Sequence, residues 1–201
     1  MLRGFINTIK LIRAEFVNEK KYGITTARIK KSDSSEFFHY QGASYLVLFK
    51  IFEHIANETK HFDFIDIGCG RGRPAFVAES FGYTTIIGID LDASLVATAN
   101  TNINYYVPKN KTSTFTFIHA NALDFNYKNK PTVYFLFNPF NETVLNSVLN
   151  KILLTTSSNT FFIYMNPTCA NVFTKDKFEV VYELKTKRYL EAIIYQLKQR
   201  V

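Results

Sequence analysis

The chain has 201 residues, 47% of them hydrophobic, so it is long and apolar enough to bury a core without disulfides or metals. Lysine and arginine outnumber aspartate and glutamate by seven, which favours acidic partners such as nucleic acid and equally suits a solvated charged face. The two cysteines, Cys69 and Cys169, exclude a disulfide framework and a C-x-x-C zinc site. We therefore expect one domain, 1–201, in the reducing cytoplasm and without a bound metal.

The first 60 residues are predicted to form a helical cap that precedes a core at residues 61–201. An amphipathic helix over residues 2–19 is predicted from apolar side chains at three- and four-residue steps: Leu2, Phe5, Ile6, Ile9, Ile12 and Phe16. We expect most of them to pack on the core. Lys10 and Arg13 interrupt the pattern and exclude a signal peptide or membrane span, so no membrane partner is expected.

Residues 20–36 are polar and irregular, which is typical of a segment that covers a site. A second helix is predicted from residue 43 to about residue 57. The pattern alternates from residue 61 onward. Strands are predicted at 62–67, 84–89, 114–119, 132–137 and 160–165, helices at 74–81, 93–104 and 141–156, and a closing hairpin at 178–184 and 189–197. The alternation of strands and helices predicts an α/β fold with a mostly parallel sheet and helices on both faces. The two final β-rich runs add an antiparallel hairpin at the C-terminus.

The first strand of the core ends in a loop with glycines at residues 68, 70 and 72, followed by Pro74 at the start of a helix. Free amides at such a helix start attract a carboxylate or phosphate. A dinucleotide fingerprint would need a third glycine at position 73, which is Arg73, so an NAD oxidoreductase is disfavoured.

Three further strands end in polar side chains, namely Asp90, Asn121 and Asn138. Open α/β sheets bind ligands beyond these strand ends, so the groups are expected to line one site. A carboxylate at position 90 suits a vicinal diol, whereas Asp92 is explained as the N-terminal cap of the next helix.

The D-x-G-x-G-x-G pattern from Asp66 to Gly72 resembles the first motif of the class I S-adenosylmethionine (SAM) methyltransferases. The predicted topology resembles their seven-stranded, Rossmann-like sheet. The resemblance implies SAM as the cofactor, with Asp90 on the ribose, Asp66 near the methionine end and Asn121, where the family often has Asp, on the adenine amine. The implied cofactor-binding residues are Tyr40, Gln41, Asp66, Gly68, Cys69, Gly70, Asp90, Leu91, Asn121, Ala122 and Asn138.

Asn138-Pro139-Phe140 resembles the N-P-P-(Tyr/Phe) motif of methyltransferases that act on amino nitrogens, with one proline missing. The resemblance implies that these three residues are catalytic: amide and carbonyl oxygens accept the hydrogens of the substrate nitrogen, and the ring packs against a flat group. A plain turn into the helix near Glu142 is the alternative. We expect methyl transfer to a nitrogen of a protein side chain. A nucleic-acid or small-molecule methyltransferase, and a non-catalytic SAM-binding partner subunit, are the rival hypotheses; the oligomeric state is left open.

Overall fold

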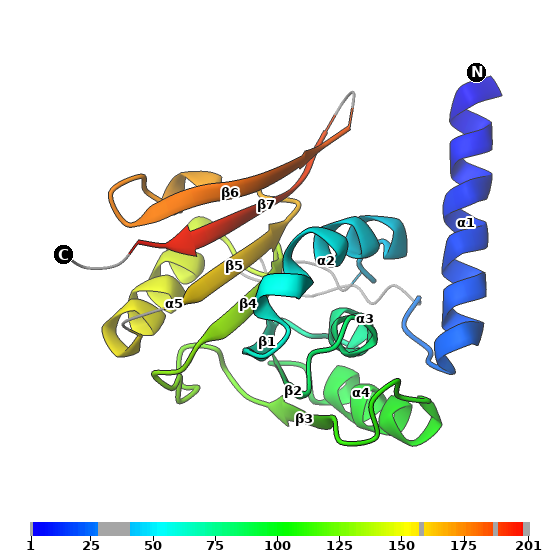
Figure 1. The fold of residues 1–201 in the computed structure, drawn as a ribbon, viewed down its shortest axis with the longest axis horizontal. Coiled ribbons are helices and arrows are strands. Elements are labelled where there is room, and N and C mark those ends of the chain that lie inside the picture. The colour runs from blue at the N-terminus through cyan, green and yellow to red at the C-terminus, as the bar shows by residue number, and fades with distance from the viewer. Residues whose placement is uncertain (1, 28–40, 157–158, 187–188, 199–201) are drawn as a thin grey trace.

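The computed structural model describes residues 2–27, 41–156, 159–186 and 189–198, with side chains from residue 12 onward. Within these ranges seven strands form one sheet (Figure 1): β1 (Asp63–Ile67), β2 (Thr85–Asp90), β3 (Thr114–His119), β4 (Thr132–Phe137), β5 (Thr160–Met165), β6 (Phe178–Lys185) and β7 (Leu190–Leu197). The strand order is β3-β2-β1-β4-β5-β7-β6. Strands β1 to β5 pair in parallel, and β7 lies antiparallel between β5 and β6. The predicted sheet and its closing hairpin are confirmed.

Helices cover both faces of the sheet. They are α1 (Leu2–Tyr22), α2 (Tyr45–Thr59), α3 (Arg73–Ser80), α4 (Ala93–Tyr105) and α5 (Glu142–Thr155), with a short 3-10 turn η1 (Ala170–Val172). Because strand side chains alternate between faces, Phe64 and Phe135 join the core under α2, α3 and α4, whereas Ile65 and Leu136 join the core under α5. The strand bounds agree with the predicted ones to within one residue.

The strand order reverses between β1 and β4, which makes this pair the topological switch point of the sheet. Asp63 pairs with Thr132 and Ile67 with Leu136, so the two strands end side by side. The glycine loop that follows β1 and the Asn138 turn that follows β4 therefore leave the sheet at the same edge. This edge is where the polar strand ends come together.

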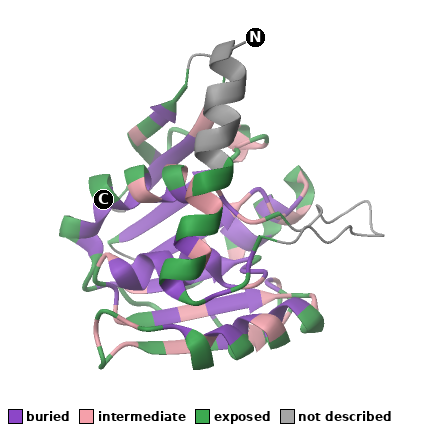
Figure 2. Cartoon of the chain, turned by 90° about the vertical axis from the view of Figure 1, so that its right-hand side faces the viewer, coloured by how far each residue is buried: buried purple, intermediate pink, exposed green. Residues whose placement is uncertain are grey.

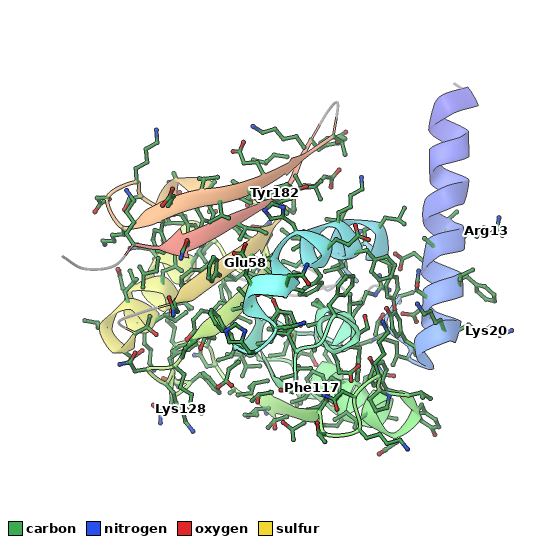
Figure 3. The ribbon with its side chains drawn as sticks, viewed as in Figure 1. Arg13, Lys20, Glu58, Phe117, Lys128 and Tyr182 are labelled. Carbon is green, nitrogen blue, oxygen red and sulfur yellow. The ribbon has the colours of Figure 1, made fainter. Side chains whose placement is uncertain are left out.

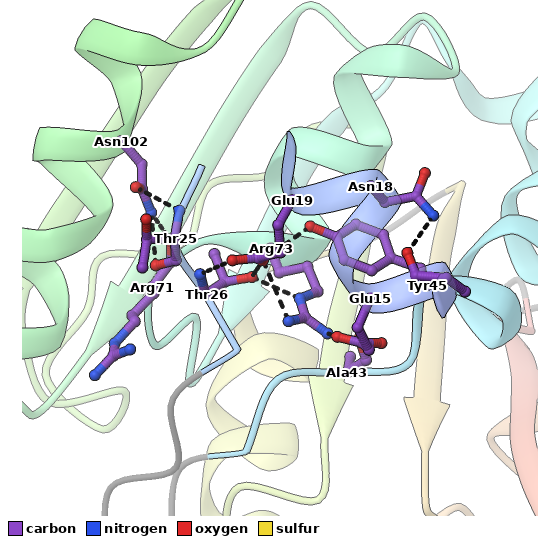
Figure 4. Close-up of polar contacts among 11 residues, drawn as sticks. Glu15, Asn18, Glu19, Thr25, Thr26, Ala43, Tyr45, Arg71, Arg73 and Asn102 are labelled. Atoms are coloured by element: carbon purple, nitrogen blue, oxygen red, sulfur yellow. Dashed lines mark hydrogen bonds and ion pairs between the residues drawn. The ribbon is translucent and has the colours of Figure 1, made fainter. Parts of the chain in front are cut away.

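Arg73, the residue that interrupts the dinucleotide fingerprint, is only 1% exposed and binds the N-terminal segment to the core (Figure 4). Its guanidinium contacts five groups: Glu15 at 2.5 Å, Glu19 at 3.3 Å, the Thr26 hydroxyl at 2.6 Å, the Ala43 carbonyl at 2.7 Å and the Tyr45 ring at 4.4 Å from its centroid. A buried guanidinium is tolerated only when its charge and its donors are satisfied in this way.

The inward side of α1 is polar. Glu15 and Glu19 face Arg73, and the buried Tyr22 donates to or accepts from the Ser80 hydroxyl at 3.1 Å. The prediction that the apolar residues of this helix pack on the core is wrong for Ile12 and Phe16, which are 64% and 73% exposed (Figure 2). Two carboxylates one turn apart must both reach one buried cation, which fixes the rotation of the helix and turns its apolar side outward.

The helix also continues to Tyr22, three residues beyond the predicted end, because Tyr22 is buried against the Tyr45 ring with their centroids 5.9 Å apart. Residues 28–36 of the predicted polar segment lie outside the described residues. No helix in the described ranges is long and apolar enough to cross a membrane.

Arg73→Met should lower the free energy of unfolding by about 2 to 4 kcal/mol, because it leaves two partly buried carboxylates without their counter-charge. Urea denaturation followed by circular dichroism measures this difference. Lys130→Met is the matched control, since its pair with Asp63 spans 3.8 Å and Lys130 is 59% exposed; it should cost no more than about 1 kcal/mol. Equal losses in both variants would contradict the anchoring role of Arg73.

Candidate functional site

The glycine loop leaves β1 in a conformation that only glycine adopts easily. Gly68 and Gly72 have φ values of 79° and 85°, and Gly72 forms the N-cap of α3. The amides of Gly68 and Cys69 donate to the Ile89 carbonyl at 2.9 and 3.0 Å. The loop is thereby tied to the end of β2.

Asp90 lies where β2 ends, and both of its carboxylate oxygens accept backbone amides, from Gly70 at 2.8 Å and from Asp92 at 2.8 Å. Asp92 caps α4 by accepting from the amides of Ser94 and Leu95, as predicted. A carboxylate has about four lone-pair sites, so a carboxylate at this position suits the hydroxyl groups of a ligand. Leu91, next to it, is 46% exposed and offers an apolar surface beside that carboxylate.

Asp66 is 1% exposed, and its Oδ2 atom has no hydrogen-bond partner among the described residues. Burial raises the pKa of its carboxyl well above the usual range, and the nearby Asp90 carboxylate raises it further. A buried acceptor that lacks a donor, beside a second carboxylate, is the arrangement that a cationic ligand relieves. Asp66 therefore fits the ammonium group of an amino-acid ligand.

Cys69 fills a small space rather than supplying a reactive thiol. It is 3% exposed, and burial raises the pKa of its thiol, as do the Asp66 and Asp90 carboxylates. The thiol therefore stays protonated at neutral pH.

Among the described residues, no three His, Cys, Asp or Glu side chains lie close enough together to hold a metal ion.

Asn121 and Ala122 follow β3, the edge strand that pairs with β2. The side-chain oxygen of Asn121 accepts a hydrogen bond from the Leu123 amide at 2.9 Å, which closes a turn. An amide oxygen has two lone pairs, so this bond uses one of them. Ala122 is 7% exposed, and its carbonyl accepts the Tyr127 hydroxyl at 2.9 Å. These bonds hold the loop after β3 in place.

The segment before α2 supplies one predicted residue and one that the sequence did not indicate. Gln41 is exposed, and Tyr40 lies outside the described residues. Ser44 is the N-cap residue of α2, yet its hydroxyl makes no capping bond; it is buried and has no partner in the described part of the chain. A serine at an N-cap predicts a helix start, so no sequence signal separated it from an ordinary cap.

Asn138 turns the chain at the end of β4 with φ of 42°, in the left-handed region that asparagine tolerates better than most residues. Pro139 then rests on the glycine loop, because a Cβ added to Gly68 would lie 2.7 Å from its Cβ. Phe140 is 7% exposed and belongs to the core under α5, so little of its ring is left for a ligand.

The Asn138 amide is held by side chains that lie 26 and 30 residues further along the chain. The hydroxyls of Tyr164 and Thr168 donate to its Oδ1 at 3.0 and 2.7 Å, and the Tyr164 oxygen also accepts the Cys169 amide at 3.3 Å. Asn138 is 6% exposed, whereas Thr168 is exposed. The only sequence signal near Tyr164 and Thr168 is a second Asn-Pro pair at Asn166, whose φ is 48°.

Residues 65–138 match the sequence profile of a family described as "Methyltransferase domain". The matched stretch runs from β1 through the glycine loop to Asn138, which covers the strand ends that form the site. No curated protein sequence matches the chain.

Solved structures share the fold. Ribosomal protein L11 methylase from Lactobacillus delbrueckii is 14% identical, with a TM-score of 0.58 over 76% of this chain and 78% of that one. Magnesium protoporphyrin IX methyltransferase from Synechocystis, with bound SAM, is 10% identical, with a TM-score of 0.57 over 75% and 76%. A SAM-dependent methyltransferase from Methanosarcina mazei is 15% identical, with a TM-score of 0.55 over 70% and 94%. At these identities the likeness concerns the fold.

Gly68→Ala should destabilise the protein by about 2 to 4 kcal/mol, because it adds a Cβ both at positive φ and against Pro139. Gly82→Ala is the matched control: its φ is also positive, at 105°, but the new Cβ meets only the Lys60 side chain, at 3.3 Å. The control should lose about 1 to 2 kcal/mol. Thermal unfolding of both variants gives the comparison, and equal losses would show that Pro139 does not press on the loop.

Proposed function

We propose that this chain is a class I SAM-dependent methyltransferase that methylates a nitrogen atom, first of all one in a protein side chain. The methyltransferase-domain match over residues 65–138 and the seven-stranded fold support the enzyme class. The observation that most supports methylation of a nitrogen is the position of the Asn-Pro turn. Pro139 lies on the glycine loop, so the main chain that would contact the acceptor borders the loop that would hold the cofactor.

The residues at the strand ends fit SAM. Asp66 would face the ammonium group of its methionine part, and Asp90 the ribose hydroxyls, with Leu91 against the purine. The loop Gly68-Cys69-Gly70 lets the cofactor approach the main chain, and Asn121 and Ala122 would border the adenine. Gln41 and Ser44 are the proposed contacts of the carboxylate end.

Bound SAM supplies a methyl group that its sulfonium already activates, so the protein has to align the acceptor and exclude water. A lysine acceptor has to lose a proton, because its unperturbed pKa is about 10.4. The proposed acceptors of the substrate hydrogens are the main-chain carbonyl and the side-chain oxygen of Asn138.

Both lone pairs of the Asn138 side-chain oxygen accept hydroxyls in this structure. Thr168 is exposed, so an incoming amine can displace its hydroxyl from the Asn138 oxygen, whereas the buried Tyr164 stays in place. In this proposal Tyr164 orients the amide and Thr168 holds the position of the substrate nitrogen. Phe140 anchors the turn by packing in the core under α5.

The acceptor class has two rivals. The net charge of +7 favours nucleic acid, and the structural neighbours are named for acceptors as different as a ribosomal protein and a porphyrin. A non-catalytic SAM-binding subunit is the rival from another class. Incubation with methyl-labelled SAM and separate protein, nucleic-acid and small-molecule fractions of a lysate distinguishes all of these, since the last rival labels none of them.

SAM affinity should rise with pH, because the cationic ligand binds the ionised Asp66 carboxylate and the pKa of that carboxyl is raised in the free protein. Because the pKa of this carboxyl is higher in the folded protein than in the unfolded chain, the free energy of unfolding of the free protein falls as pH rises above the pKa of the unfolded chain. Asp66→Asn should remove this decrease in stability. Calorimetry in two buffers of different ionisation enthalpy measures proton release on SAM binding. Unchanged proton release in Asp66→Asn would remove Asp66 from the cofactor site.

Asn138→Gly should lower turnover roughly 10²-fold, about 2.7 kcal/mol, while SAM affinity stays nearly the same. Glycine is chosen because it adopts the positive φ of this position without strain. Asn166→Gly is the control, since Asn166 also has a positive φ before a proline, 48° against 42°, and is exposed. Full activity of Asn138→Gly on the acceptor found by fractionation would reduce Asn138 to a turn residue.

A further inference from the structure

The outward side of α1 presents an apolar and basic surface to solvent. It consists of five exposed residues with the spacing of one helix face: Ile12, Arg13, Phe16, Val17 and Lys20. Ile12, Phe16 and Val17 are 64%, 73% and 50% exposed. Figure 2 views the molecule from this side, and Figure 3 shows Arg13 and Lys20 pointing away from the core. We call these five residues the outer face of α1.

The described part of the chain leaves these three apolar side chains half or more exposed. The opposite side of the helix is used, through Glu15 and Glu19, to reach Arg73. Single exposed apolar residues are ordinary on protein surfaces, but a contiguous group with basic neighbours is typical of an interaction surface. The sequence extends the same apolar period toward the N-terminus, through Ile9, Phe5 and Leu2.

The charges of the helix are separated by side. Its two carboxylates, on Glu15 and Glu19, bind the buried Arg73, whereas Arg13 and Lys20 are exposed on the outer face. Lys21, also exposed, adds a third cation beside it. The acidic side chains of α1 therefore do not neutralise the positive charge of the outer face. This face is complementary to a partner that has both negative charge and an apolar region.

We propose that the outer face of α1 binds the surface of a membrane that contains anionic lipid. Phe16, Ile12 and Val17 enter the boundary between headgroups and acyl chains, and Arg13 and Lys20 contact lipid phosphates. This mode requires no membrane-spanning helix, because the helix lies in the plane of the interface. It differs in this from the membrane span and the signal peptide that the charges of this segment exclude.

Two other partners fit the outer face less well. A second copy of the chain would bring Arg13 and Lys20 of both copies together, and like charges at a contact oppose association. Nucleic acid would use the cations but would leave Ile12 and Val17 in water. The anionic lipid surface is the partner that satisfies both kinds of side chain. The proposal does not depend on the identity of the methyl acceptor.

The test is sedimentation of the full chain with vesicles of phosphatidylcholine alone and of phosphatidylcholine mixed with phosphatidylserine. We expect binding to the mixed vesicles that weakens with added salt, and at least tenfold weaker binding to phosphatidylcholine alone. Ile12→Ser combined with Phe16→Ser should weaken the binding at least tenfold. Leu154→Ser, an 84% exposed leucine on α5, is the apolar control and should bind like the unaltered protein.

A charge-matched pair of variants separates position from net charge. Arg13→Glu with Lys20→Glu should weaken vesicle binding at least tenfold, whereas Lys111→Glu with Lys128→Glu, which changes the net charge equally at exposed positions elsewhere, should change it less than threefold. Thermal unfolding should be the same for all four outer-face and control variants, because none of the altered side chains is buried.

The proposal is overturned if mixed and neutral vesicles bind equally or not at all, or if the two charge pairs weaken binding to the same extent. Two parallel measurements identify the alternatives. A dimer in light scattering that Ile12→Ser with Phe16→Ser dissociates would assign the outer face to a second copy. Binding of a labelled oligonucleotide that the same variant abolishes, without vesicle binding, would assign it to nucleic acid.

Discussion

The close approach of the glycine loop to the end of β4 is the constraint on which the site depends. β1 and β4 pair in register as far as Ile67 and Leu136, so the segments that follow the two strands leave the sheet side by side. Pro139 then occupies the space that a Cβ of Gly68 would need. Because this contact is between main chain and a rigid ring, it fixes where Asn138 lies relative to the loop. Asp66 and Asn138, which end neighbouring strands, thereby share one edge of the sheet.

Arg73 provides the second constraint, at the other end of the glycine loop. It begins α3 directly after Gly72 and binds Thr26 and Ala43, two residues that lie far apart in the sequence. Asn102 reinforces the same junction, since its side chain accepts the Thr25 amide and donates to the Arg71 carbonyl. The N-terminal segment is therefore attached to the loop by buried polar bonds, which leaves the apolar side of α1 for another partner.

The electrostatics of the site are unfavourable in the free protein and favourable for a cationic ligand. Asp66 is buried beside Asp90 without a donor for its Oδ2 atom among the described residues. Natural proteins keep such unsatisfied groups where a ligand completes them. The fold that surrounds this arrangement serves proteins named for different acceptors, so the sheet by itself does not determine the acceptor.

Local patterns in the sequence were sufficient for the sheet, the helices and the cofactor loop. Strand alternation, the glycines from Gly68 to Gly72 and the cap at Asp92 depend on neighbouring residues, and each recurs in the structure at nearly the predicted position. Nothing in these features requires knowledge of residues far away in the chain.

Tertiary structure alone decided three things. It determined which side of α1 faces the core, because a helical period marks an apolar side but not whether a buried cation such as Arg73 competes for the other side. It gave Tyr164 and Thr168 their roles, because their bonds to Asn138 join residues from different strand ends. It also left the Oδ2 atom of Asp66 buried without a donor among the described residues. Hydrogen bonds and burial between distant segments depend on how the layers pack, and that information is absent from any single stretch of sequence.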